Sequence, residues 1–177
     1  ALVVSREWER GTMEALMATP IAIAELILGK LIPYFALGMS GMALSVAMAV
    51  WLFDVPLRGS LWVLFAVGSV FMVAALGMGL LISTVARNQM AASQIGIVAA
   101  FLPAIMLSGF LFDIGSMPWA IQGLTYILAA RYFVSTLQTL FLVGDVWSVV
   151  VPDVLAMGAI ALFFLLVTAR KTRKRLD

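Results

Sequence analysis

Residues 61–85 read LWVLFAVGSVFMVAALGMGLLISTV, an unbroken apolar run without an acidic or basic side chain. A helix needs roughly 20 such residues to cross a hydrocarbon core of about 30 Å. A charge at the centre of the bilayer costs about 2.5–3.5 kcal/mol on insertion scales, so a charge-free window of this length indicates a membrane span. This run therefore predicts a transmembrane helix.

Three other windows have the same character, at residues 31–53, 90–112 and 146–169. The last is marginal because Pro152 and Asp153 lie near its start, and its boundary stays open. The chain of 177 residues is 64% hydrophobic and 11% charged, whereas soluble domains are about half apolar and about a quarter charged. We therefore expect an all-α, polytopic helical membrane protein with four transmembrane helices.

The basic residues predict the orientation of these spans, because lysine and arginine accumulate on the cytoplasmic side. If both ends of the chain and the connection at 86–89 face the cytoplasm, nine of the eleven basic residues lie inside: Arg6, Arg10, Lys30, Arg87, Arg170, Lys171, Arg173, Lys174 and Arg175. Only Arg58 and Arg131 then lie outside. Residues 170–177 would form a basic cytoplasmic tail, and an even number of crossings agrees with four spans.

The segment 113–145 is apolar, but glycine, proline and polar residues interrupt it before any window reaches spanning length. It predicts one or two short helices that lie at the outer interface or dip into it. Trp119, Tyr126 and Tyr132 are suitable interfacial anchors. The alternative is a fifth crossing, which would place the basic tail outside.

Small residues recur at four-residue spacing in the spans, where they allow close helix contacts in lipid. The stripes are Ala92, Gly96, Ala100, Ala104 and Ser108 in the third span, Ala75, Gly79 and Ser83 in the second, and Gly41, Ser45 and Ala49 in the first. They favour packing within the chain. The alternative is that one stripe forms a subunit interface.

The composition argues against catalysis by this chain. It has no histidine and no cysteine, which removes the commonest metal ligands and the commonest general base. Gly29-Lys30 lacks the flanking residues of a nucleotide-binding P-loop. We expect no catalytic residue, no metal site and no cofactor in the chain. The basic residues report topology, so we also expect no nucleic-acid partner.

The segment 5–25 begins SREWERGTMEALMATP and predicts a short amphipathic helix. Thr12 is a suitable N-cap, Glu14 lies in the first turn, and Pro20 ends the helix. Met13, Leu16 and Met17 share one face. Taken alone, this pattern favours an interfacial helix that leads into the first span.

The same stretch, followed by ELILGKLIPY at residues 25–34, resembles the type-2 ABC exporter permease family. The pattern SGF at 108–110, MPW at 117–119 and RYF at 131–133 resembles the region before the last span of that family. The resemblance covers essentially the whole chain, residues 1–177, as the C-terminal part of an ABC-2-type transmembrane domain. It implies a cytoplasmic coupling helix at 5–25, short re-entrant helices at 113–145, and two further spans upstream.

The resemblance also implies roles for individual residues. Contacts with the ATPase would involve Glu7, Arg10, Gly11, Thr12, Glu14 and Thr19. Glu25 and Lys30 could form an inner collar, although a lysine that reaches the interface from a helix end is an equal alternative. An outer gate would involve Phe110, Pro118, Trp119, Arg131 and Tyr132. The sequence departs from the family pattern at two places near this gate. It has Ala129-Ala130 where the family often has Asn-Pro, and Gln138 where the family often has a basic residue.

The function implied is that of a permease subunit of an ATP-driven exporter in the bacterial inner membrane. An ATP-binding cassette subunit would bind ATP and Mg²⁺, and a second permease chain, identical or different, would complete the pathway within membrane lipid. The few polar residues in the spans favour a hydrophobic or amphipathic substrate, drug-like or lipid-linked. The alternatives are an ATP-independent channel or carrier, and a membrane scaffold that transports nothing.

Overall fold

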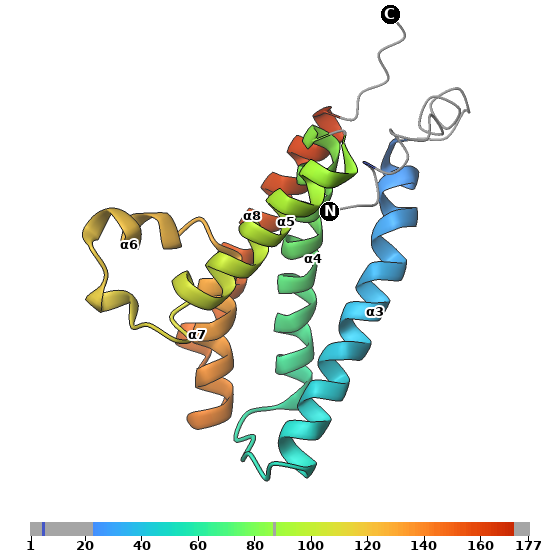
Figure 1. The fold of residues 1–177 in the computed structure, drawn as a ribbon. Coiled ribbons are helices and arrows are strands. Elements are labelled where there is room, and N and C mark those ends of the chain that lie inside the picture. The colour runs from blue at the N-terminus through green and yellow to red at the C-terminus, as the bar shows by residue number, and fades with distance from the viewer. Residues whose placement is uncertain (1–4, 6–22, 87, 172–177) are drawn as a thin grey trace, which may run out of the picture.

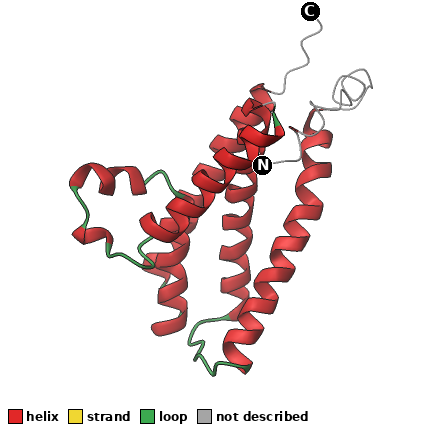
Figure 2. Ribbon diagram, viewed as in Figure 1, coloured by secondary structure: helices red, strands yellow, loops and turns green. Residues whose placement is uncertain are grey.

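The computed structural model describes residues 5, 23–86 and 88–171, and the elements formed by these residues are helices (Figures 1 and 2). The elements are α3 (Ile23–Trp51), α4 (Leu61–Ala86), α5 (Gln89–Leu102), the π-helical turn η1 (Pro103–Leu107), the 3-10 turn η2 (Ile114–Ser116), α6 (Trp119–Thr125), α7 (Ala129–Leu142) and α8 (Trp147–Lys171).

Within the described residues, four helical stretches are long and apolar enough to cross a membrane. They are Ile27–Trp51, Leu61–Ala86, Gln89–Leu107 and Trp147–Lys171. Many of their large apolar side chains are exposed, as expected for helices whose surroundings are lipid rather than water. The prediction of a polytopic helical membrane protein with four spans is confirmed.

The third span ends before the predicted Phe112. Helical geometry stops at Leu107, and Gly109 has a φ of 85°, a left-handed conformation that suits a residue without a Cβ. The amide of Phe110 donates to Ser108 Oγ over 3.4 Å. Upstream, α5 passes into the π-helical turn at Pro103, whose missing N–H removes one backbone hydrogen bond.

Helix α4 is the centre of the bundle and contacts α3, α5, α7 and α8. It packs most extensively against α8, where a Cβ added to Gly77 would lie 3.3 Å from Phe164 Cβ. Val67 of α4 packs with Val150 and Met157 of α8 in a buried apolar cluster. The ring of Phe133, on α7, stacks on Phe71 of α4 with centroids 4.2 Å apart. These contacts join α4, α7 and α8 into one core.

Helix α3 is held to α4 by a reciprocal contact between methionine and glycine. The thioether of Met72, on α4, lies against Gly38 of α3, and the thioether of Met42, on α3, lies against Gly68 of α4. Most of the remaining surface of α3 is exposed. Small residues thus allow the two helices to approach each other, while the rest of α3 is left to face lipid or other protein segments.

The described helices have two distinct ends (Figure 1). The start of α3, the connection between α4 and α5, and the end of α8 lie at one end, and the loop after α3 lies at the other. At this second end, the amide of Ser60 donates to Asp145 Oδ1 over 2.8 Å, and the amide of Gly59 donates to the carbonyl of Leu140 over 2.8 Å. The α3–α4 loop is therefore tied to the turn between α7 and α8.

The segment between the third and fourth spans leaves the bundle sideways. In Figure 1, η2 and α6 project from the side of the bundle at about the middle of its height, and α7 then runs beside α8 toward the end where the α3–α4 loop lies. The short helices of this segment therefore project from the side of the bundle and do not lie on its end.

Candidate functional site

The predicted ATPase-coupling residues lie outside the residues that the structure describes. These are Glu7, Arg10, Gly11, Thr12, Glu14 and Thr19. Ser5, which precedes them, is described, and its amide donates to the buried Ser83 Oγ of α4 over 2.9 Å. The beginning of the predicted coupling segment therefore adjoins α4 at the end of the bundle where α3 starts.

The two residues of the predicted inner collar lie on the first turns of α3. Glu25 is exposed, and Lys30 is partly buried. Lys30 lines a small cavity of about 120 Å³ with Tyr34 of α3 and Ser83 of α4. Five positions along a helix of about 3.6 residues per turn separate the two residues by about 1.4 turns of α3.

Two of the predicted outer-gate residues, Arg131 and Tyr132, meet at the corner between α6 and α7. Arg131 Nη1 donates to Oγ1 of the buried Thr125, and the guanidinium carbon lies 3.9 Å from the ring centroid of Tyr126. The hydroxyl of Tyr132 donates to the carbonyl of Tyr126 over 2.9 Å. The start of α7 thus holds the end of α6, and we call residues 125–132 the outer corner.

A glutamine that interrupts the apolar segment 113–145 organises the turn before this corner. Gln122 Nε2 donates to the carbonyl of Met117 over 2.8 Å and to that of Gly115 over 3.3 Å. Asp113 Oδ1 accepts from the amide of Gly115 over 3.1 Å and caps η2. From the sequence alone, the polar residues of this segment, Asp113 and Gln122 among them, only interrupt an apolar run, and Thr125 does not stand out. Their spacing on short, irregular turns gives no periodic signal.

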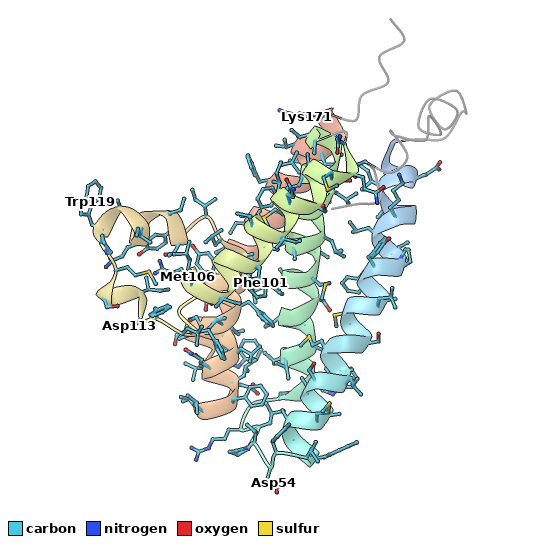
Figure 3. The ribbon with its side chains drawn as sticks, viewed as in Figure 1. Asp54, Phe101, Met106, Asp113, Trp119 and Lys171 are labelled. Atoms are coloured by element: carbon cyan, nitrogen blue, oxygen red, sulfur yellow. The ribbon has the colours of Figure 1, made fainter. Side chains whose placement is uncertain are left out.

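The other three predicted gate residues lie apart from the outer corner. Phe110 is highly exposed just after the end of the third span, and Pro118 is the N-cap residue of α6. Trp119 is 87% exposed and lies at the far edge of the excursion (Figure 3). Of the five predicted gate residues in the described part of the chain, Arg131 and Tyr132 lie at the outer corner, and Trp119 lies at the edge of the excursion at about the middle height of the bundle.

Replacing Arg131 with alanine is expected to loosen the outer corner, because Thr125 loses its donor and Tyr126 loses a cation–π contact. These two contacts contribute about 1–2 kcal/mol together. Hydrogen exchange of the amides at residues 124–128, measured by mass spectrometry, should speed up by roughly tenfold. Gln138→Ala, an exposed change on the same helix, should leave these rates unchanged. Equal exchange rates at residues 124–128 in Arg131→Ala and Gln138→Ala would contradict the role of Arg131 in holding the outer corner.

An open apolar groove with a volume of about 610 Å³ lies between α4 and α5. Its lining is almost wholly apolar, with Ser93 as the polar side chain. The lining residues are Ala75, Met78, Gly79 and Ile82 of α4, and Ser93, Gly96, Ile97, Ala100, Phe101 and Ala104 of the third span. We call this feature the α4–α5 groove.

The small-residue stripe of the third span faces this groove. Ala92 is fully buried, whereas Gly96, Ala100 and Ala104 line the groove. Small side chains here leave space beside α4 instead of filling it. On the second span, Gly79 and Ala75 line the same groove. Within the small-residue stripe of the third span, Ala92 therefore packs inside the chain. The later residues of this stripe and the small residues of α4 form the walls of the groove.

Residues 1–142 match the ABC-2 type transporter family. The chain belongs to this family. Its relatives include the "Probable multidrug ABC transporter permease YbhS" of Escherichia coli, which is 56% identical over all 177 residues, and the "Probable multidrug ABC transporter permease YbhR" of the same organism, 30% identical over 80% of the chain. The "Inner membrane transport permease YhhJ" of Escherichia coli is 31% identical over 96% of the chain.

This ABC-2 chain spans about half the length of these relatives: 47% of YbhS, 38% of YbhR and 45% of YhhJ. No solved structure matches it. The family match confirms the resemblance seen in the sequence and identifies the chain as part of an ABC transporter permease, the membrane component of such a transporter.

Proposed function

We propose that this ABC-2 chain forms part of the substrate pathway of an ATP-driven exporter in a bacterial inner membrane, and that the α4–α5 groove contributes to that pathway. A separate or fused ATPase supplies the energy, because the chain has no P-loop. The observation that carries the proposal is the α4–α5 groove itself, an open apolar cavity of about 610 Å³ on an ABC-2 domain.

The groove favours hydrophobic or amphipathic substrates. Cavities of about 300–1,000 Å³ suit drug-sized molecules, and the walls here offer the hydroxyl of Ser93 and no charged side chain. A substrate with an exposed charge would lose its hydration without a partner in this groove, which is costly. The names of YbhS and YbhR, which describe probable multidrug permeases, agree with an apolar substrate of broad chemical type.

The distribution of basic residues supports a definite orientation. Lys30, Arg170 and Lys171 lie at the end of the bundle where α3 starts, and Lys171 and Asp54 lie at opposite ends in Figure 3. We place the end with Lys171 in the cytoplasm by the positive-inside rule. The coupling segment at 5–25 then faces the ATPase. The outer corner, whose residues 127–130 line a cavity with Ala74 and Met78 of α4 and Phe164 of α8, lies near the middle of the bundle.

A second permease chain completes the pathway in this proposal. The third span has exposed apolar side chains at the rim of the groove, Ile97 and Phe101, and the α4–α5 groove is open. A partner chain, identical or not, would cover this surface and close the groove. ATP and Mg²⁺ would bind to the ATPase, which docks on residues 6–20. The rival functions are an ATP-independent channel and a scaffold that transports nothing.

The proposal is tested by purifying the full-length permease in mild detergent and measuring whether an ATPase subunit co-purifies and drives export in vesicles. Glu14→Arg reverses one charge in the proposed docking helix, so we expect the ATPase to bind at least about tenfold more weakly. Glu9→Arg is the matched control, because it makes the same charge change in the same segment at a position without a proposed contact.

Two results would refute the proposal. One is a full-length permease that exports its substrate without any ATPase, which would favour the channel. The other is an ATPase affinity that Glu14→Arg leaves at the level of the Glu9→Arg control, which would remove the docking role of residues 6–20.

A further inference from the structure

Asp153 is an acidic side chain inside the last span that neither the α4–α5 groove nor the coupling segment uses. It lies six residues after the start of α8 at Trp147, or about 9 Å along the axis at 1.5 Å per residue. Its neighbours Val150, Val154 and Met157 pack in the apolar cluster with α4 and α7. Polar groups in such surroundings are costly unless they are hydrogen-bonded, and ionisable residues within spans usually have a function.

The partner of Asp153 is Thr136 of α7. Thr136 is fully buried, and its Oγ1 donates to Asp153 Oδ2 over 3.0 Å. Within the described part of the chain, this is the hydrogen bond found for the Asp153 side chain. The bond therefore joins the re-entrant helix α7 to the spanning helix α8 through two side chains, next to the apolar core.

The hydroxyl of Thr136 is used differently from most hydroxyls in these helices. Six other serine and threonine hydroxyls donate to the backbone carbonyl four residues earlier in the chain: Ser45, Ser69, Thr84, Ser108, Thr139 and Thr168. This local bond satisfies a hydroxyl in an apolar environment without any partner helix. Thr136 could make the same bond to the backbone carbonyl four residues earlier on α7. It bonds to α8 instead because Asp153 offers an acceptor oxygen there.

The bond is linked to the outer corner through one turn of α7. Tyr132 precedes Thr136 by four residues, so the two side chains lie on the same face of the helix. Tyr132 packs against the same apolar cluster, and its hydroxyl holds the carbonyl of Tyr126. A shift of α7 along α8 would therefore move Tyr132, and with it the end of α6.

We propose that Asp153 is a positioning residue: through Thr136 it sets the height of α7 on α8 and thereby keeps the outer corner in place. The inference rests on the proposed function only for the role of the corner in closing the outer side of the pathway. The role requires an acceptor oxygen at position 153 and not a negative charge, since the donor is a neutral hydroxyl. An asparagine at this position would serve, and a leucine would not.

The test is the reactivity of a thiol at the start of α7. The chain has no cysteine, so Ala130→Cys adds a single thiol to it, in a full-length permease whose remaining cysteines, where present, are replaced. Labelling by a water-soluble maleimide is measured on the purified protein in lipid nanodiscs. Thr136→Val should raise the labelling rate roughly tenfold, the change in an equilibrium that loss of one net hydrogen bond produces. Thr139→Val is the matched control, because the hydroxyl of Thr139 bonds only within α7.

The substitutions at position 153 test whether the acceptor oxygen, and not the negative charge, holds α7 in place. Asp153→Leu should label as fast as Thr136→Val, while Asp153→Asn and Thr136→Ser, which keep the hydrogen bond, should label at the parental rate. The proposal is overturned if Thr136→Val labels no faster than Thr139→Val, or if Asp153→Asn behaves as Asp153→Leu does. Because labelling does not depend on transport, a parental protein that exports nothing would refute the proposed function and leave this comparison intact.

Discussion

Replacing Gly77 with leucine is expected to prevent α4 and α8 from packing, so that little folded protein is recovered. A Cβ at this buried position would lie 3.3 Å from Phe164 Cβ and 3.5 Å from Leu165 Cγ, before the rest of the leucine side chain is added. Overpacking of a tight contact costs about 1–3 kcal/mol. Since α4 contacts α3, α5, α7 and α8, separation from α8 disturbs the whole core.

The measurement is the monodisperse fraction after solubilisation in detergent, together with the midpoint of thermal unfolding. Gly158→Leu on α8 is the matched control, because a Cβ there would meet no atom within 4 Å. This control removes the effect of glycine on helix propensity and on hydrophobicity. If both variants unfold at the same midpoint, the close approach of α4 and α8 at Gly77 does not determine stability.

Replacing Ala100 with tryptophan is expected to reduce export to background while the ATPase remains bound. Ala100 is exposed, lines the α4–α5 groove and also lines the adjoining cavity near Ala129 and Phe164. An indole ring buries about 150–250 Å² of surface, so it would occupy much of the groove. The helices need not separate, because the space beside Ala100 is open. Substrate would therefore lose its site while the fold is kept.

Val98→Trp is the control for this substitution. Val98 is 60% exposed on the same helix, two residues away on the opposite face, and does not line the groove. Export in vesicles and ATPase co-purification are measured for both variants. Export by Ala100→Trp at the level of Val98→Trp would exclude the α4–α5 groove from the pathway. Loss of the ATPase in Ala100→Trp alone would point to a folding defect.

We expect Gly77→Leu to impair folding and Ala100→Trp to impair export, because α4 is more tightly packed than α5. α4 has buried residues along its length, whereas among the described side chains of the third span Ala92 is the buried one. The core of α4, α7 and α8 is thus the structural frame. The third span lies at its edge and leaves space beside it. Cavities and moving parts are expected where buried contacts are few.

The membrane environment, the helical class and the number of spans were all predictable from the sequence. The physical reason is local: a hydrocarbon layer accepts only a backbone that bonds to itself, over a charge-free length that can be counted along the chain. The run at 61–85 predicted a helix that the structure begins at Leu61 and ends at Ala86. Family membership was also predictable, because it resides in the order of residues along the chain.

The partners of individual side chains were decided only by the tertiary structure. Asp153 could be found in the sequence as an acid inside a span, but its bond to Thr136 depends on how α7 docks on α8. The outer corner similarly depends on the reversal between α6 and α7, which brings Arg131 to Thr125. The α4–α5 groove depends on the angle between two helices whose small residues would equally permit close packing. Such contacts join segments by packing, for which hydrophobic periodicity carries no information.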